Sequence, residues 1–136
     1  MTTITIRVAG PPMQKERVRI NHKSGTAYTP QRTVNYEGRL AGEAQRAMKN
    51  FVPFSGPVRV KLTLLMPVAE SWSAKKKAAA LKGELMPTGR PDLDNVGKLL
   101  DACNMIVFND DKQVCDFHMI KKYSLRPGLE LVIETM

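Results

Sequence analysis

The segment RPDLDNVGKLLDA, residues 90–102, holds the side chains best suited to chemistry. Positions two apart in a helix point to different sides, so Asp92 and Asp94 converge on one ion only if Asp92 still lies in extended chain before the helix. Pro91 supports this arrangement, because proline is favoured at a helix entrance and disfavoured inside a helix. Lys98 lies at i+4 from Asp94, on the same helical face. Two carboxylates and one ammonium are therefore predicted to share a small surface.

A second acidic group follows in FNDDKQV, residues 108–114. Asp111 in this predicted turn would lie over the first pair and complete an oxygen-rich site, with Asp110 as a further candidate ligand. Oxygen ligands of this kind suit Mg²⁺, and Mn²⁺ as well. Lys98 would then stabilise negative charge developing on phosphorus or orient the attacking water. The pattern indicates metal-dependent phosphodiester cleavage. The predicted ligands are Asp92, Asp94 and Asp111.

The same aspartates also have a purely structural interpretation. An aspartate such as Asp92 before a helix is a common N-cap, and a pair such as Asp110-Asp111 is a common turn former. We assign Asp101 and Asp116 to solvated or ion-paired roles. Because three carboxylates fall beside a basic body, the metal site is the interpretation we favour.

A second catalytic pattern stays open. Asp92, followed after an interval by Asp110-x-Lys112, loosely matches a restriction-nuclease-like signature. In that pattern Lys112, in place of Lys98, is the catalytic lysine.

The rest of the chain is strongly basic. Its 136 residues carry a net charge of +8, and the first 91 hold 16 Lys and Arg against five Glu and no Asp, a formal charge of +11. Such a surface favours a polyanion, with nucleic acid first and an acidic membrane surface second. The residues expected to contact DNA are Lys15, Arg17, Arg19, Lys23 and Arg90.

The composition is that of one soluble globular domain, with 43% hydrophobic and 25% charged residues. No apolar run approaches the roughly 18 residues of a membrane span. Cys103 and Cys115 form no CxxC pair, so a zinc site or disulfide framework is not expected. We expect both to be buried thiols in a reducing cytoplasm.

The hydrophobic pattern predicts an α+β domain, a small mixed sheet with helices packed on one face. The expected strands cover residues 3–8, 58–66, 113–123 and 129–134, with a loose hairpin around Lys23-Ser24-Gly25. The expected helices run from Thr33 as cap to Asn50, from Ser73 as cap to Lys82, and from about Leu93 to Ile106. The lysine run at 75–77 is expected to form a solvated helix face.

These residues resemble the RusA family of Holliday junction resolvases, found in bacteria and their prophages. The family pattern D-x-D-N-x-x-K, then D-D-x-x-V, is matched by Asp92, Asp94, Asn95, Lys98, Asp110, Asp111 and Val114. GPPMQKERVR, residues 10–19, is similar to the family's opening strand and basic loop, and YTPQRTVNYEG, residues 28–38, to the entry of its first long helix. The resemblance spans nearly the whole chain.

The resemblance implies a homodimeric, Mg²⁺-dependent endonuclease that nicks two opposing strands of a four-way DNA junction, in the cytoplasm of a bacterial or phage-infected bacterial cell. It implies catalytic carboxylates at Asp92, Asp94 and Asp111, with Lys98 as the essential basic residue. In the family, the acidic clusters of both subunits lie along a basic dimer face. One departure is the segment at residues 71–89, which compact members lack and which resembles an insertion of phage-type members.

Other functions stay open at this point: a nuclease of other branched or flapped DNA, and a catalytically silent basic DNA-binding protein in which the aspartates only cap and turn. Two coordinated cuts need two sites, and one chain supplies one, so a two-fold dimer is expected. The expected interface elements are the strand Ile4–Val8 and the helix Thr33–Asn50. A monomer is the alternative, because a chain of this size can fold alone.

Overall fold

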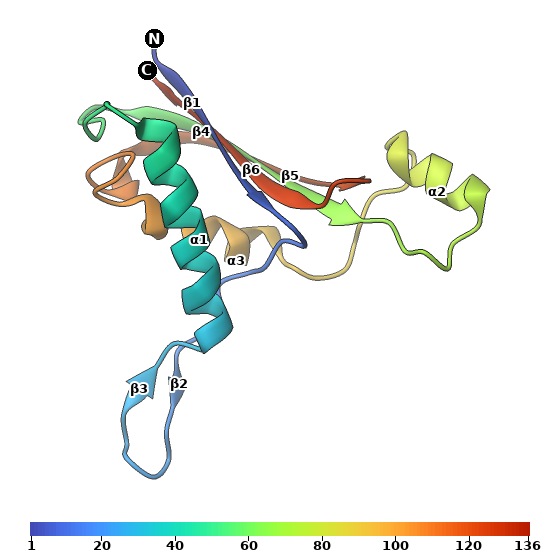
Figure 1. Ribbon diagram of the computed structural model, residues 1–136, viewed down its shortest axis with the longest axis horizontal. Helices are drawn as coiled ribbons and strands as arrows, with labels where there is room; N and C mark the ends of the chain where they lie inside the picture. The colour runs from blue at the N-terminus through green and yellow to red at the C-terminus, as the bar shows by residue number, and fades with distance from the viewer.

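The computed structural model describes all residues, 1–136, and contains a four-stranded mixed sheet (Figure 1). The strands are β1 (Thr3–Ala9), β4 (Val58–Pro67), β5 (Val114–Ser124) and β6 (Gly128–Thr135), in the order β1-β6-β4-β5. Strand β6 pairs antiparallel with both β1 and β4, while β4 and β5 are parallel. The predicted small mixed sheet is confirmed, with strand bounds within one or two residues of those expected.

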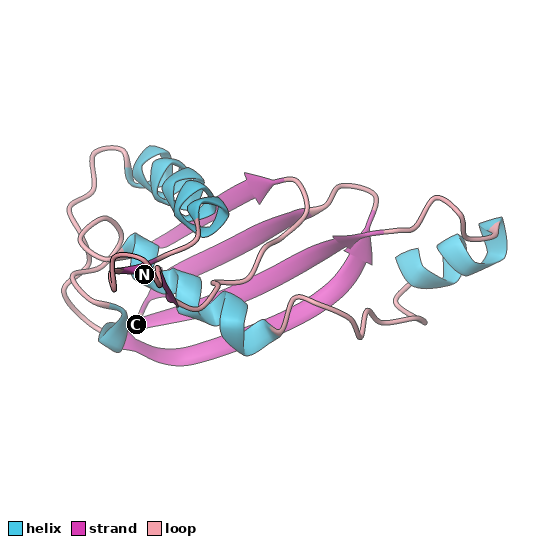
Figure 2. Cartoon of the chain, turned by 90° about the horizontal axis from the view of Figure 1, so that it is seen from below, coloured by secondary structure: helices cyan, strands magenta, loops and turns pink.

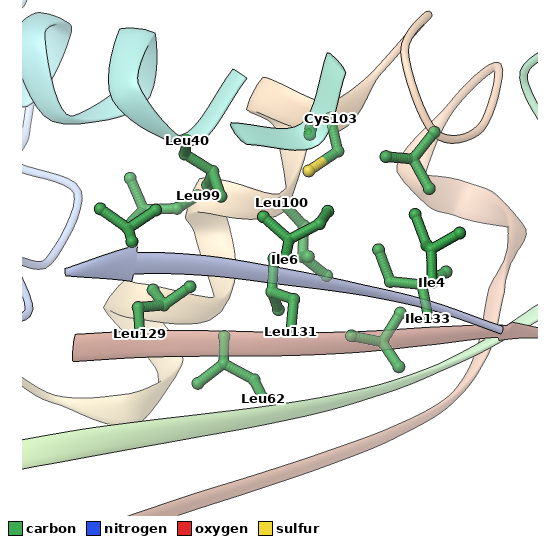
Figure 3. Close-up of a cluster of buried hydrophobic side chains, with 14 of the residues drawn as sticks. Ile4, Ile6, Leu40, Leu62, Leu99, Leu100, Cys103, Leu129, Leu131 and Ile133 are labelled. Carbon is green, nitrogen blue, oxygen red and sulfur yellow. The ribbon is translucent and has the colours of Figure 1, made fainter. Parts of the chain in front are cut away.

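Alternation along the strands places one face of the sheet in the core. In β1, Ile4, Ile6 and Val8 are buried while their neighbours face outward. The same face of β6 buries Leu129, Leu131 and Ile133. Figure 3 shows Ile4 and Ile6 of β1 with the three β6 side chains between the sheet and the helical layer. There they form one core cluster with Leu40, Leu99, Leu100 and Cys103. Burial of this apolar surface is the main force that holds the helices, and with them the acidic motif, against the sheet.

Helix α1 (Gln31–Met48) covers the core face of the sheet beside β1. Its N-cap is Pro30, three residues before the predicted cap, so the prediction of Thr33 as cap is wrong. Proline presets the backbone for entry into a helix, and Thr33 instead lies in the first turn. There its buried hydroxyl contacts Glu16, accepting from the Glu16 backbone N–H at 3.3 Å.

The predicted long helix at residues 93–106 is wrong in its length and type. An α-helical turn, α3 (Leu93–Gly97), passes directly into a 3₁₀-helix, η1 (Lys98–Cys103). The buried residues Val96, Leu99, Leu100 and Cys103 form pairs spaced by three, which matches the three-residue repeat of a 3₁₀-helix. Gly97 at the junction allows close approach to β5, since a Cβ there would lie 3.2 Å from Met119 Sδ and 3.4 Å from a ring carbon of Phe117.

Two elements extend from this body. The short strands β2 (Arg19–Ile20) and β3 (Ala27–Tyr28) form the predicted hairpin, which is exposed throughout. Helix α2 (Ala74–Leu81) lies beyond the ends of β4 and β5, away from the other helices (Figures 1 and 2). The predicted Ser73 cap is confirmed, since its side chain accepts from the Lys76 N–H at 3.2 Å. Gly83, at φ 83°, closes the helix as its type suggests.

The remaining expectations on the fold have mixed outcomes. Cys103 is fully buried, and burial together with the charge of Asp101 raises its pKa to about 12. Cys115 is exposed, so its predicted burial is wrong; it lies at a register shift between β4 and β5. No helix is both long enough and apolar enough to span a membrane.

Candidate active site

Asp92 occupies the N-cap position of α3 but does not act as a cap. Its backbone is extended, with φ −75° and ψ 135°, as predicted from Pro91. Its side chain accepts no hydrogen bond from the first turn of the helix and is exposed. The Asp92 backbone N–H donates to Gln14 Oε1 at 3.2 Å. The carboxylate is therefore held at a fixed place in the backbone and left without a structural partner.

Asp94 and Lys98 lie on the first turns that follow. Asp94 is exposed in the first turn of α3. Lys98 Nζ donates to the side chain of Asn95 at 3.2 Å and forms no ion pair with Asp94. The Lys98 side chain is thus turned toward Asn95, three residues back, and leaves the Asp94 carboxylate without an ion pair. The ammonium faces a cleft of about 450 Å³, bounded by Asn95 and the basic segment 14–19.

Asp110 is the N-cap of the 3₁₀-helix η2 (Asp111–Gln113), and Asp111 is its first residue. The two carboxylates have different contacts. Asp110 is an N-cap with both parts of a capping box: its carboxylate accepts from the Lys112 N–H at 2.9 Å, and its own N–H donates to Gln113 Oε1 at 2.9 Å. The Lys112 N–H and a hydrogen bond with Asp111 lower the pKa of Asp110. The structural interpretation of Asp110 as a turn former is confirmed.

Asp111 has the opposite electrostatic environment. Burial raises the pKa of its carboxyl, and the hydrogen bond with Asp110 and the charges of Asp110 and Asp101 raise it further. Loss of the proton from Asp111 places a negative charge close to other carboxylates. A nearby cation would stabilise this charged form.

Lys15 and Asp101 join the N-terminal basic loop to the acidic motif, a contact that the sequence did not indicate. Lys15 Nζ donates to Asp101 Oδ2 and lies 3.8 Å from Glu37, while the Lys15 backbone N–H donates to Asn95 O at 3.2 Å. Partial burial works to lower the pKa of Lys15, but the bond to Asp101 and the charge of Glu37 outweigh it and raise that pKa. The other oxygen of Asp101 is buried without a partner. The ion-paired role assigned to Asp101 is confirmed, as is that of Asp116, which pairs with Arg59 at 2.7 Å.

The loop before Asp92 is held from β5. Lys121 Nζ donates to the backbone carbonyls of Gly89 and Pro91, at 2.5 and 3.0 Å. Asp92 is thus fixed on both sides, by Gln14 through its own N–H and by Lys121 through the residues before it. Neither contact has a local sequence signal, because each joins residues at least 30 positions apart.

Three of the other cations predicted to contact DNA line clefts: Arg17 and Arg19 line the cleft beside Lys98, and Arg90 lines a second cleft. Arg17, Lys23 and Arg90 are exposed and pair with no carboxylate, whereas Arg19 lies 3.2 Å from Glu16. This second cleft, of about 400 Å³, continues from the first past Arg32 and Arg90. Negative charge on a ligand would be matched by positive charge along this path.

The carboxylates are not gathered into a ready-made metal site. No three His, Cys, Asp or Glu side chains lie close enough together to hold an ion. The donor set still fits a hard divalent cation, because Asp92 and Asp94 offer exposed oxygen atoms and Asp111 carries a raised pKa among neighbouring acids.

An α+β domain with unpartnered carboxylates beside a basic cleft has the features of an enzyme that acts on a polyanion. The family model of endodeoxyribonuclease RusA matches residues 9–134. The uncharacterized protein YqaN of Bacillus subtilis (strain 168) is 35% identical over 138 residues, which cover 98% of this chain and 96% of that protein. The chain belongs to the RusA family of endodeoxyribonucleases, hydrolases that act on DNA and include Holliday junction resolvases.

Proposed function

We propose that this protein is a Mg²⁺-dependent endonuclease that resolves four-way DNA junctions by paired, symmetric nicks, in recombination and repair. The observation that carries the proposal is the state of Asp92, a carboxylate at a helix start that is positioned by Gln14 and engaged by nothing. A residue held in place without a structural partner is suited to hold a ligand. Family membership supports the reaction and the class of substrate.

Asp92, Asp94 and Asp111 bind the cation in this proposal. Their oxygens suit Mg²⁺, with Mn²⁺ as the alternative ion. When bound, the cation supplies Lewis-acid polarisation of the scissile phosphate and a water that is easier to deprotonate. Asp111, the first residue of η2, would supply the third carboxylate. Its raised pKa supports this role, because a cation would relieve the repulsion that Asp110 and Asp101 impose on it.

Lys98 stabilises the negative charge that develops on the phosphate as the bond breaks. Its ammonium is oriented by Asn95 and faces the basic cleft, so it can meet a phosphate without first leaving an ion pair. Lys112 is a poorer candidate, because its backbone N–H is part of the η2 cap and its side chain is exposed outside the clefts that adjoin Lys98.

Arg17, Arg19, Lys23 and Arg90 bind phosphates around the junction. The exposed hairpin of β2 and β3 carries Lys23 away from the body, toward DNA that lies beyond the cleft. Lys15 contributes by a different route, since its ion pair with Asp101 holds the basic loop against α3 and η1.

The protein acts as a homodimer in this proposal, since a four-way junction is itself roughly two-fold symmetric and each chain supplies one site. The apolar side chains Ile4, Ile6 and Val8 of β1 are buried in the chain's own core, so β1 would contribute its free backbone edge and its outward-facing side chains. Light scattering at micromolar concentration should give twice the 15.2 kDa chain mass. A monomer that still makes paired cuts would contradict the dimer.

Cleavage of a synthetic four-way junction with fixed arms tests the function. We expect symmetric paired nicks with Mg²⁺, none with EDTA, and none from Asp92→Asn, which should still bind the junction. Duplex, flapped and three-way DNA of the same sequence are the comparison substrates. Equal cleavage of flaps and four-way junctions would instead identify a general nuclease of branched DNA, and binding without any cleavage a silent DNA-binding protein.

A further inference from the structure

Helix α2 and its C-cap present a basic surface that the proposed reaction does not use, bordered by Glu70 and Glu84. Between Ser71 and Gly83 there are four lysines and no acidic residue. None of the four pairs with a carboxylate. Lys75 in the first turn and Lys82, the C-cap residue with helical backbone angles, are exposed and seven positions apart. They therefore lie on one side of the helix, about 10 Å apart along its axis. That is roughly three base steps of B-form DNA at 3.4 Å each.

The helix is anchored at its base, so its lysines are presented from a defined position. The ring of Trp72 meets that of Tyr123 edge-on, with centroids 5.3 Å apart and planes at 76°. Lys76 Nζ lies 4.2 Å above the Trp72 ring, a cation–π contact. Ala80 is buried. A flexible solvated arm would need none of these contacts.

A groove made of three clefts with shared residues leads from the proposed catalytic lysine to this base. The cleft beside Lys98 shares Arg19 with the second cleft, and the second shares Arg90 with a third, of about 300 Å³, which ends at Trp72. The first two clefts are basic, whereas the third is mainly apolar with Arg90 as its one cation. Glu16 is the one acidic residue that lines any of the three. The phosphate backbone of DNA is the extended polyanion that matches such a path.

We propose that α2 is a second DNA-contact surface, on which Lys75 and Lys82 bind phosphates of a duplex arm that leaves the active site along this groove. The inference rests on the proposed function, because it takes the junction as the ligand. Phosphate contacts of this kind fix position and add affinity without reading sequence. The segment at residues 71–89 thereby lengthens the footprint on one arm of the junction.

Binding to junctions with long and with successively shortened arms tests this surface, in EDTA so that no cleavage occurs. Lys75→Gln with Lys82→Gln should weaken binding to the long-arm junction by roughly tenfold or more, and reduce the log–log salt slope by about 0.9 for each lost contact. The difference from the unmodified protein should vanish on the shortest arms. Arg46→Gln with Lys49→Gln removes the same charge from the end of α1, across the molecule from α2. With its mass by light scattering equal to that of the unmodified protein, so that an effect on the dimer is excluded, this control should bind as the unmodified protein does.

Three results would overturn the inference. Long-arm binding by the α2 double variant equal to that of the α1 double variant would mean that the lysines are solvated or serve a partner other than DNA. Equal weakening on every arm length would mean a general field effect and no contact with the arm. Failure of the unmodified protein to bind or cut the junction would overturn the proposed function, and this inference with it.

Trp72 gives a second measurement that needs no variant. It is the single tryptophan of the chain, and Lys76 covers its ring. Its fluorescence should change when a long-arm junction binds and stay constant with the shortest arms. A constant emission on saturation with the long-arm junction would contradict contact at α2.

Discussion

The starts of α3 and η2 present the same residue type at the same helical position, with opposite results. Asp110 caps η2 with its carboxylate, while Asp92 at the start of α3 caps nothing. In both cases the backbone N–H of the aspartate donates to a glutamine side chain. For Asp110 this is Gln113, three residues on, and for Asp92 it is Gln14, 78 residues away in sequence.

The comparison shows how a fold can keep a carboxylate free. In a capping box the residue at the third helical position reaches back, and the cap side chain bonds forward. At α3 that third position is Asn95, whose side chain is occupied by Lys98, and Gln14 supplies the missing acceptor from another part of the chain. Asp92 is thereby positioned through its backbone, and its carboxylate oxygens form no hydrogen bond with the helix. Of Asp92 and Asp110, Asp92 is the one that we propose binds metal.

Substitution of each aspartate by asparagine should give the largest difference between the proposed metal ligand, Asp92, and the helix cap, Asp110. Asp92→Asn should reduce junction cleavage by about 10²–10³ or more, because the proposed cation, which stabilises charge in the transition state, loses a ligand. Asp110→Asn should cleave nearly as the unmodified protein does, since asparagine is an equally good N-cap. Single-turnover cleavage with thermal unfolding as a control for folding makes the measurement. Equal loss of cleavage in both variants would contradict the division of roles.

Substitution of Lys98, which follows Asp92, should reduce cleavage more than substitution of Lys112, which follows Asp110. Lys98→Ala should lower the cleavage rate by about 10²–10³, and Lys112→Ala should change it by a few-fold at most. The reason is that, of these two lysines, only Lys98 faces the cleft. Single-turnover rates at saturating Mg²⁺ decide the ranking. The reverse order would favour the restriction-nuclease-like pattern.

Substitution of Gln14 should mainly reduce activity, whereas substitution of Gln113 should mainly reduce stability. Gln14→Ala frees the Asp92 backbone and should reduce activity about 10-fold to 100-fold, the range for residues that orient metal ligands. Gln113 also donates to the carbonyls of Phe54 and Gly56, at 2.8 and 2.9 Å. Gln113→Ala should therefore cost about 1–3 kcal/mol of unfolding free energy. Urea unfolding and cleavage rates of both variants test the division, and a Gln14 variant with full activity would refute the positioning role.

Asp111→Asn should give the smallest effect on stability, with a sign opposite to most substitutions. The raised pKa means that folded Asp111 holds its proton more tightly than the unfolded chain does, so stability falls as pH rises through the interval between the two pKa values. At neutral pH the variant should melt a few degrees higher, because asparagine still donates to Asp110 without the charge. The gain should shrink as pH falls toward about 4.

A matched substitution and added metal sharpen that test. Asp116→Asn breaks a pair with Arg59 and should lower the melting temperature slightly. Mg²⁺ should raise the melting temperature of the unmodified protein more than that of Asp111→Asn. A lower melting temperature for Asp111→Asn at neutral pH would contradict the repulsion described here.

Local patterns in the sequence predicted the local structure, and long-range contacts were beyond them. Alternation in β1 and β4, and the cap at Ser73, were sufficient to place those elements. The early start of α1 follows from Pro30, a local signal that the prediction of Thr33 as cap passed over. The change to 3₁₀ geometry after Gly97 accompanies close packing against β5, which no local window contains. The acidic residues themselves were visible as a cluster, but the contacts of Gln14, Lys121 and Lys15 that position them join distant segments.

The strand order has a consequence for how the protein is made. β6 separates β1 from β4, yet it follows every other element in the chain. Until residues 128–135 have been synthesised, Ile4, Ile6 and Val8 have no neighbouring strand, and the layer that supports Asp92 has no completed sheet to pack on. A nascent chain that stops before Gly128 therefore cannot assemble the proposed active site. A truncated product carries the acidic motif without the completed sheet that positions it.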